Sequence, residues 1–279
     1  MKVVGLGSAG CNIADCFAEY PQYQIYKIDN DLPKQKGNLS VSKCESVEEY
    51  EEKCPSFKNF FRGIKTGDEV VFVVCGASSI SAISLRVLEA IRRANVKILY
   101  IAPDRSLVSN KLHTHERVVF GVLQEYARSG VFERMYIVKN DILEEILDNV
   151  PVVGYYNVLN NLIVSTVHMI NVYENNDPVY RNSTESLKTA KISTIGIVKI
   201  KENQENLFYP LDTINEKCYI YAINGDRLET DGKLFSKLKK KIVNNKELEL
   251  MSNVQIHSTD YGDDYGYVIA SSSEIQTQE

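Results

Sequence analysis

Residues 2–18 of the chain, KVVGLGSAGCNIADCFA, decide its fold. The apolar run Val3–Leu6 is typical of a short buried β-strand, and the apolar residues that follow at Ile13 and Phe17 have the spacing of one helix face. Three glycines lie within and between the two patterns. A strand, a glycine turn and a helix in this order point backbone N–H groups and the positive end of the helix dipole at one position, which suits a phosphate group.

The glycines form the pattern Gly5-x-Gly7-x-x-Gly10, which is formally the fingerprint of dinucleotide-binding proteins. Asp29 lies 29 − 10 = 19 residues after Gly10, near the end of a second predicted strand, Gln24–Ile28. Because an acidic residue at this place holds the ribose of NAD, an NAD(P)-dependent Rossmann oxidoreductase is one hypothesis. In the structural alternative, the glycines only let the strand and the helix pack closely.

Composition narrows the choice of protein class. Of 279 residues, 44% are apolar and 25% charged, as in ordinary globular proteins, and a net charge of −5 gives no reason to expect a nucleic-acid partner. No apolar run approaches the about 20 residues that a membrane-spanning helix needs, so no membrane insertion is expected.

The six cysteines include no Cys-x-x-Cys pair, and several lie in apolar segments. They are interpreted as reduced, buried thiols of a cytoplasmic protein rather than as disulfides or zinc ligands. The four histidines are scattered without ligand-spaced partners, so no metal site is predicted.

Predicted strands and helices alternate through the first half of the chain. The continuous apolar run Glu69–Cys75 is typical of a central parallel strand covered on both faces. Further strands are expected at Val96–Ala102 and Met135–Val138, with helices at 47–53, 83–91, 112–129 and 141–147. Residues 1–150 therefore predict an α/β domain with a doubly wound parallel sheet.

The second half begins with a long helix, predicted at Val152–Val172, which is apolar nearly all round and so is expected to be buried between layers or domains. After Ala190 the pattern changes to a mixture of strands and short helices. Strands are predicted at 191–200, 218–223, 254–257 and 265–270, a turn at 224–226 and a Lys-rich helix at 234–243. We expect a central helix over 151–175, a smaller α+β domain over 176–271 and a frayed polar tail over 272–279.

Taken in this order, nearly the whole chain resembles the tubulin/FtsZ family, and FtsZ most closely. Gly5–Asn12 resembles the family's first phosphate loop, G-x-G-G-G-G-x-N, and Asp29–Asp31 sits where the family has N-T-D. Phe72–Gly76 resembles the strand before the family's signature loop, and Tyr136–Asp141 resembles its I-x-x-P-N-D motif.

The resemblance continues through the second half. Val158–Leu159 matches the start of the family's central helix, where Asn157 falls on the base-contacting Asp, and 219–226 and 254–271 follow the order of its second domain. The resemblance implies a GTPase that binds GTP or GDP, with Mg²⁺ when GTP binds, and that assembles head to tail with itself or a tubulin/FtsZ-like relative. The nucleotide positions it implies are Gly7, Ser8, Ala9, Gly10, Cys11, Asn12, Asp29, Asn30, Gly76, Ala77, Ser78, Ser79, Ser81, Pro103 and Asn157.

The signature loop departs from the family's pattern, G-G-G-T-G-[ST]-G. Residues 76–82 read GASSISA, so one glycine remains, and the loop is shorter. Each lost glycine places a Cβ where phosphates need close backbone approach, and Ile80 adds a branched apolar side chain. The hydroxyls of Ser78, Ser79 and Ser81 remain available as hydrogen-bond donors to phosphate.

A second departure concerns hydrolysis. In the family, an N-x-D-x-x-D loop of the next subunit polarises the attacking water, and an ungapped register places Asp177–Asn182 on that loop. Val179 and Asn182 then replace the acidic residues, although Asp177 or Glu174 compensates if the register shifts. We therefore predict a degenerate GTP site with catalytic positions Asp177 and Asn182 and little or no hydrolysis. The alternative is an active GTP-hydrolysing filament protein.

The pair Tyr155–Tyr156, at the head of the central helix, has two interpretations. The rings are either a stacking surface for a guanine base or part of the packing of the core or a domain interface.

Overall fold

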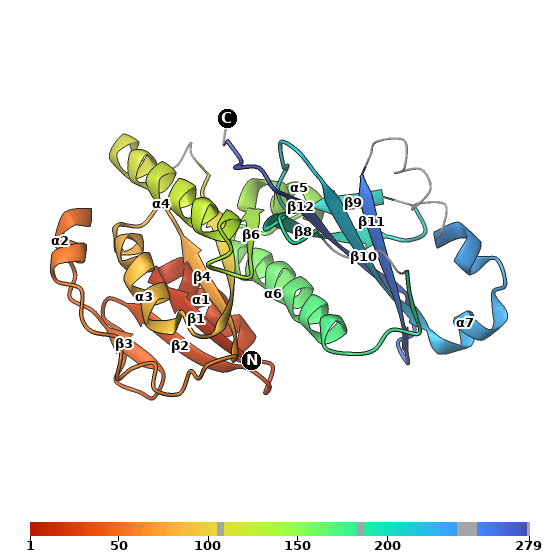
Figure 1. Cartoon of the computed structure of the whole chain (residues 1–279), viewed down its shortest axis with the longest axis horizontal. Coiled ribbons are helices and arrows are strands. Elements are labelled where there is room, and N and C mark those ends of the chain that lie inside the picture. The colour runs from red at the N-terminus through yellow and green to blue at the C-terminus, as the bar shows by residue number, and fades with distance from the viewer. Residues whose placement is uncertain (105–108, 183–186, 203, 239–249, 278–279) are drawn as a thin grey trace. The chain divides into compact units, whose positions relative to one another are not determined.

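The computed structural model describes residues 1–104, 109–182, 187–202, 204–238 and 250–277. The chain divides into two compact units, Met1–Val164 (unit 1) and Ser165–Glu279 (unit 2), and the boundary lies within the long helix α6 (Tyr155–Glu174). Figure 1 shows unit 1 in red to green and unit 2 in green to blue.

The strands of unit 1 form a parallel sheet in the order β3-β2-β1-β4-β5-β6. They are β1 (Lys2–Leu6), β2 (Gln24–Asp29), β3 (Asn38–Ser40), β4 (Glu69–Cys75), β5 (Asn95–Ala102) and β6 (Arg134–Lys139). The prediction of a doubly wound parallel sheet is confirmed. In sheets of this order, ligands bind outside the carboxyl ends of the strands where the order reverses, which here is between β1 and β4.

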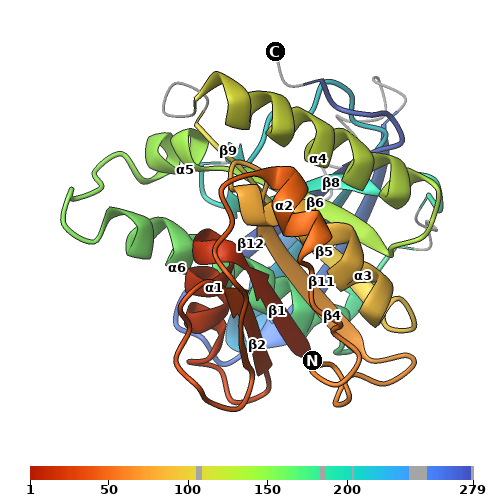
Figure 2. The ribbon, with the colours of Figure 1, turned by 90° about the vertical axis from the view of Figure 1, so that its left-hand side faces the viewer.

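The helices of unit 1 connect these strands. They are α1 (Gly7–Phe17), α2 (Val47–Glu52), the 3₁₀ helix η1 (Ser79–Ile83), α3 (Ser84–Ile91), α4 (Asn110–Arg128), α5 (Asn140–Leu147) and the first part of α6. Figure 2 shows α1 beside β1 and β2, on which it packs through its buried apolar face. The interior residues of β4, Val70–Val74, are fully buried, as expected for a strand covered on both faces.

Unit 2 contains a mixed sheet in the order β8-β12-β10-β11-β7, with β9 paired to β8. The elements are β7 (Tyr180–Arg181), β8 (Ile192–Lys199), β9 (Gln204–Leu207), β10 (Glu216–Asn224), α7 (Gly225–Thr230), β11 (Met251–Thr259) and β12 (Tyr265–Ser272). β10 and β11 run parallel, and the other pairs are antiparallel. The core includes Tyr219, Tyr221 and Val268.

Two differences from the sequence predictions have a clear local cause. α6 begins at Tyr155 rather than Val152, after Gly154 with a positive φ of 78°. The predicted turn at 224–226 is instead the start of α7, because the Asn224 side chain accepts hydrogen bonds from the first backbone N–H groups of the helix.

The polar end of the chain also differs, since the expectation of fraying is wrong for residues 272–277. Ser272 and Gln276 are buried, and the Gln276 carboxamide oxygen accepts a hydrogen bond from the backbone of Asp212. The Lys-rich helix is observed over 234–238, and its predicted remainder lies outside the described residues. In the part of the chain that is described, no helix combines the length and the apolar character that crossing a membrane requires.

Candidate functional site

The first glycine turn is shaped by close backbone packing. A Cβ on Gly5 would lie 2.4 Å from the carbonyl oxygen of Gly10, and a Cβ on Gly10 would lie 2.6 Å from that of Val73. Gly7, the first residue of α1, has a φ of +72°, which glycine adopts without strain. The turn therefore needs these glycines for its own geometry.

The N-terminal residues of α1 leave one side of the turn open. Ser8, Ala9 and Asn12 are exposed at the positive end of the helix. The Ser8 hydroxyl donates to the Asp29 carboxylate at 3.0 Å, and the same carboxylate accepts from the backbone N–H of Asn30 at 2.8 Å. The predicted positions Ser8 on α1 and Asp29 and Asn30 at the end of β2 are thus brought together.

Cys11 belongs to the core rather than to the open side. Its thiol is buried and lies within hydrogen-bonding distance of the carbonyl oxygens of Gly5 and Ile28. Burial, with a further contribution from Asp29, raises the pKa of Cys11 to about 12. The thiol therefore stays protonated and unreactive at neutral pH.

The second loop, Gly76–Ala82, is held by its own side chains. The buried Ser81 hydroxyl donates to the carbonyl oxygen of Ser78 at 2.7 Å, lies 3.1 Å from that of Gly76, and is 2.9 Å from Nε2 of His115. Burial lowers the pKa of His115. A hydroxyl carries one proton, so these contacts use the donor capacity that Ser81 would offer to a ligand.

A Ser–His pair at this distance also has the spacing of a nucleophile and its base. Ser81 is, however, almost completely buried, so no substrate reaches its oxygen in this conformation. The pair is therefore a structural contact that ties η1 to α4.

Ile80 lies against the first turn. Its side chain is only 3% exposed, and a Cβ on Gly7 would be 2.9 Å from the Ile80 Cγ2 methyl group. The second loop thus places a branched apolar side chain directly beside the glycine at which α1 begins.

A buried carboxylate lies behind the second loop. Glu116 on α4 is fully buried, its Oε1 accepts from the Tyr100 hydroxyl at 2.6 Å, and its Oε2 has no hydrogen-bond partner among the described residues. A Cβ on Gly76 would lie 2.2 Å from the Tyr100 hydroxyl oxygen. Gly76 is therefore required by the packing of Tyr100.

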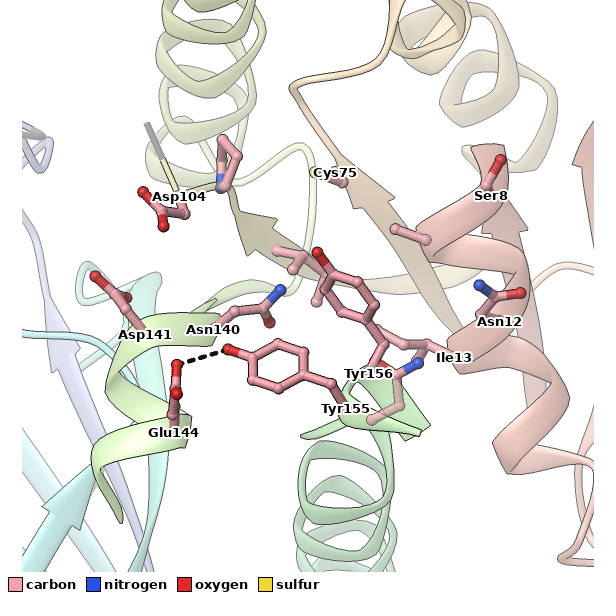
Figure 3. A pocket seen from close by; sticks show the side chains of 14 residues that line it. Ser8, Asn12, Ile13, Cys75, Asp104, Asn140, Asp141, Glu144, Tyr155 and Tyr156 are labelled. Atoms are coloured by element: carbon pink, nitrogen blue, oxygen red, sulfur yellow. Dashed lines mark hydrogen bonds between the residues drawn. The ribbon is translucent and has the colours of Figure 1, made fainter. Parts of the chain in front are cut away.

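A pocket of about 510 Å³ lies at the carboxyl ends of the unit 1 strands (Figure 3). It is lined by Ser8, Ala9, Asn12, Ile13, Cys75, Ile101, Pro103, Asp104, Asn140, Asp141, Glu144, Tyr155, Tyr156 and Asn160. These described lining residues include three carboxylates and no lysine or arginine. The wall of the pocket is thus acidic, apart from the positive end of α1.

Two tyrosines at the start of α6 project into this pocket (Figure 3). The Tyr155 hydroxyl donates to Glu144 at 2.8 Å, and the rings of Tyr155 and Tyr156 meet edge to face at 5.1 Å. Burial and this hydrogen bond raise the pKa of Tyr155 to about 12. The rings therefore present apolar surface within an acidic pocket.

The structure divides the predicted nucleotide positions into two groups. Ser8, Ala9, Asn12 and Pro103 line the pocket. The remaining positions lie in the turn, at the end of β2, in the second loop or on α6, outside the lining: Gly7, Gly10, Cys11, Asp29, Asn30, Gly76, Ala77, Ser78, Ser79, Ser81 and Asn157.

The predicted catalytic positions lie in unit 2. Asp177 is exposed in the loop after α6, whereas Asn182 is bound to β11. The Asn182 carboxamide accepts from the backbone N–H of Val254 at 2.9 Å and donates to the carbonyl oxygen of Ser252 at 2.9 Å. Its side chain thus prolongs the pairing of β7 with β11.

Sequence patterns did not identify Asp104, Asn140, Asp141 and Glu144 as a group. Their common signal is position, because Asp104 follows the end of β5 while Asn140, Asp141 and Glu144 follow the end of β6. The carboxyl ends of parallel strands meet at one edge of a sheet. Among the described residues, no cluster of three or more His, Cys, Asp or Glu side chains is suited to hold a metal ion.

No protein-family model and no curated protein sequence matches the chain. Solved structures do match. An empty FtsZ dimer from M. jannaschii aligns with a TM-score of 0.69 at 12% identity and covers 97% of this chain and 87% of that one. A GTPγS-form protofilament of TubZ from Bacillus thuringiensis serovar israelensis gives 0.71 at 13%, covering 96% and 86%.

GDP-bound monomeric CetZ1 from Haloferax volcanii aligns with a TM-score of 0.68 at 17% identity and covers 98% of this chain and 94% of that one. At identities this low, the likeness concerns the fold. Over nearly its whole length the chain therefore has the tubulin/FtsZ fold shared by FtsZ, TubZ and CetZ1, as the resemblance in the sequence predicted.

Proposed function

We propose that this chain is a tubulin/FtsZ-like protein with a degenerate GTP site, which hydrolyses GTP little or not at all. It acts by assembling with copies of itself or with a tubulin/FtsZ-like relative. The observation that carries the proposal is the contact between Ile80 and Gly7.

This contact bears on phosphate binding directly. A helix N-terminus binds phosphate when the anion can reach the free backbone N–H groups, and glycine at the turn allows that approach. Here the Ile80 methyl group lies beside Gly7, and the Ser81 hydroxyl donates its hydrogen bond to the Ser78 carbonyl oxygen within the loop. A triphosphate needs access to backbone N–H groups and hydrogen bonds from hydroxyl groups. Both are less available here than in the family's pattern.

The charge of the pocket points in the same direction. The described lining carries the carboxylates of Asp104, Asp141 and Glu144 without a lysine or arginine. A triphosphate brings several negative charges, and like charges at short range disfavour binding. The residues present therefore do not fit GTP with Mg²⁺ well.

Asn182, at the position that would act on the active site of the next subunit, also argues against hydrolysis. If Asn182 lies on the loop that reaches the next subunit, it places an amide where the family has a carboxylate. An amide cannot accept a proton from water as a carboxylate does. Its oxygen and nitrogen are also engaged with β11. Since phosphoryl transfer depends mainly on positioning and charge, losing both carboxylates would cost orders of magnitude in rate.

Assembly is proposed from the fold. TubZ with this fold is a protofilament and also forms two-stranded and four-stranded filaments, and FtsZ is a dimer. A heterologous contact between identical copies that does not close into a ring yields a filament.

The test combines GTP binding with phosphate release on the purified chain and two variants. We expect phosphate release close to the buffer background and weak GTP binding for the unaltered chain, and tighter binding for Ile80→Ala. Ile83→Ala is the matched control, because Ile83 is equally buried in η1 but is not a neighbour of Gly7. Robust phosphate release that disappears on substitution of Asp177 or Asn182 would establish an active GTPase and defeat the proposal.

NADH is included as a second ligand. Tight NADH binding that weakens on Asp29→Ala would favour the oxidoreductase hypothesis instead, because Asp29 would then hold the ribose.

A further inference from the structure

We propose that a polar groove between α2 and α3 of unit 1 binds a short acidic peptide segment of a partner protein. The groove has a volume of about 590 Å³ and is lined by the end of α2, the loop that follows it and the exposed face of α3. The two helices lie side by side in both views (Figure 1, Figure 2). The groove shares no lining residue with the pocket at the strand ends, so the inference is independent of the GTP site and of self-assembly.

The sequence around the groove carries an excess of positive charge. Residues 53–67 contain four lysines and arginines without an Asp or Glu, and residues 84–95 contain three arginines and one glutamate. The chain as a whole has a net charge of −5. A local excess of cations on an acidic protein favours an anionic partner at that place.

Three of these cations line the groove itself, Lys58 from the loop and Arg86 and Arg92 from α3 and its end. Lys58 and Arg92 are exposed, and among the described residues their side chains form no hydrogen bond or ion pair. Arg86 lies 3.8 Å from Glu89, and these two side chains are 67% and 63% exposed. Because an ion pair this exposed contributes little, all three cations are available to a carboxylate of a ligand.

The positive surface continues beyond the end of the groove. The backbone N–H of Gly67 donates to the carbonyl oxygen of Arg93 at 3.0 Å, so the turn that carries Lys65 lies beside the end of α3. Lys65 and Arg93 are both exposed. A peptide longer than the groove would therefore meet further cations on leaving it.

Aromatic packing holds the loop of the groove in place. Phe57, which lines the groove, and Phe61 are only 3% and 4% exposed. Their ring centroids lie 6.0 Å apart, and the ring of Phe61 lies 5.7 Å from that of Tyr26 on β2. Because the loop is already fixed to the sheet, a ligand does not have to order it, which lowers the entropy cost of binding.

The α2 side of the groove determines which kind of anion fits. Glu51 and Glu52 line it, and among the described residues their side chains form no hydrogen bond or ion pair. These carboxylates repel a ligand that presents only negative groups, such as a nucleic acid or an anionic membrane surface. A peptide brings backbone N–H groups as well as carboxylates, so it donates to the glutamates while its acidic side chains pair with the arginines.

The experiment measures binding of a fluorescein-labelled hexaglutamate peptide to the full chain by fluorescence anisotropy. We expect saturable binding with a Kd on the order of 10–100 µM at low salt, which weakens as salt rises. The double variant Arg86→Glu/Arg92→Glu should bind about tenfold or more weakly, because repulsion replaces two charge-assisted contacts. A labelled oligonucleotide and phosphatidylserine vesicles are the rival anions, and each should bind more weakly than the peptide.

Cys54 provides a second measurement, because this half-buried thiol lines the groove. At a peptide concentration about ten times the Kd, alkylation of Cys54 by iodoacetamide should slow about tenfold, as followed by mass spectrometry of tryptic peptides. Cys218, which is also half-buried but belongs to unit 2, is the internal control, and its rate should not change.

Two matched variants place the same charge change elsewhere. Arg117→Glu alters an exposed arginine on α4, and Lys201→Glu alters an exposed lysine of unit 2. Neither residue lines the groove, so peptide binding should stay unchanged in both. Thermal unfolding of every variant establishes that each one is folded before it is compared.

Four results would overturn the inference. They are an absence of saturable binding up to about 1 mM peptide, binding that Arg86→Glu/Arg92→Glu leaves unchanged, binding that does not protect Cys54, and tighter binding of the oligonucleotide or the vesicles than of the peptide. None of these measurements involves GTP or assembly, so a failure here leaves the proposed function untouched.

Discussion

The two loops that face each other at the carboxyl ends of β1 and β4 differ in how many glycines they keep and in what surrounds those glycines. In the first, Gly5 and Gly10 touch neighbouring backbone so closely that no Cβ fits. In the second, residues 76–82 keep a single glycine, Gly76, whose Cβ would collide with the Tyr100 hydroxyl. The glycines that remain in both loops are those that packing requires.

If the GTP site is degenerate, as we propose, this difference indicates which glycines such a loss can remove. A glycine needed only for a ligand's approach can be replaced once that approach no longer matters, whereas a glycine needed by the fold cannot. A side chain at such a position can then make contacts of its own, as Ile80 does beside Gly7. Packing alone can therefore keep a glycine fingerprint in a sequence, and the fingerprint does not by itself indicate a bound ligand.

The largest effect is expected in the first loop. Gly5→Ala would push a methyl group to within 2.4 Å of the Gly10 carbonyl oxygen and 2.9 Å of the Cys11 nitrogen, and neither backbone atom can move without opening the turn. We expect a loss of about 3 kcal/mol or more in the free energy of unfolding, measured by urea denaturation. Gly121→Ala on α4 is the control, since nothing lies within 4 Å of its Cβ, and it should be neutral or stabilising. Equal effects at the two sites would break the comparison.

Removing the support of the second loop should have the next largest effect. Tyr100→Phe deprives the buried Glu116 carboxylate of its hydrogen bond, so we expect a cost of about 1–3 kcal/mol in unfolding free energy. Tyr221→Phe makes the same change at a fully buried tyrosine whose hydroxyl has no partner among the described residues, and should cost nothing. If both variants lose stability alike, the Tyr100–Glu116 contact does not support the loop.

A similar cost is expected for Asn182, which the sequence alone assigns to catalysis. Asn182→Ala removes two hydrogen bonds to β11 and should lower stability by about 1–2 kcal/mol. Asp177→Ala, at an exposed position before β7, should stay within about 0.5 kcal/mol of the unaltered chain. Chemical denaturation of the two variants side by side decides whether Asn182 has a structural role.

The smallest effect concerns pH and the second loop. Burial lowers the pKa of His115 below its ordinary value of 6.5, so the neutral ring is favoured in the folded chain. Its contribution to stability is present above the ordinary pKa and is lost as pH falls through the folded pKa. His115→Gln keeps a hydrogen-bonding side chain that does not titrate, so its urea midpoint should fall less between about pH 7 and pH 5. Because burial also lowers the pKa of His168 and His257, some pH dependence remains, and an unchanged slope would contradict the role of His115.

The sequence predicted the sheet of unit 1 well because its strands carry their own signal. Glu69–Cys75 was predicted and is observed with the same bounds, since a continuous β-branched run follows a Thr-Gly-Asp turn. The strands Asn38–Ser40 and Tyr180–Arg181 were missed, because each is a short, half-polar edge strand that forms only through its neighbour. Val152 and Val153 fit a helical pattern, but the positive φ of Gly154 separates them from α6.

The site was predictable only in part for a related reason. The turn that precedes α1 follows from adjacent residues, so Ser8, Ala9 and Asn12 were predicted at a phosphate-binding turn, and in the structure they line the pocket. The contact of Ser81 with His115 joins residues 34 positions apart, and no local pattern encodes it. The engagement of Asn182 depends equally on a distant strand. Sequence patterns identify which polar side chains could bind a ligand. Tertiary contacts decide which of these side chains already form hydrogen bonds within the protein.

The most direct test of the central claim is to ask whether a nucleotide stays with the protein. The purified, unaltered chain is denatured in acid, and the released nucleotide is quantified by ion-exchange chromatography. We expect far less than one GTP or GDP per chain, because Ile80 lies beside Gly7 and the described pocket lining is acidic. A full equivalent of GDP or GTP would contradict the account.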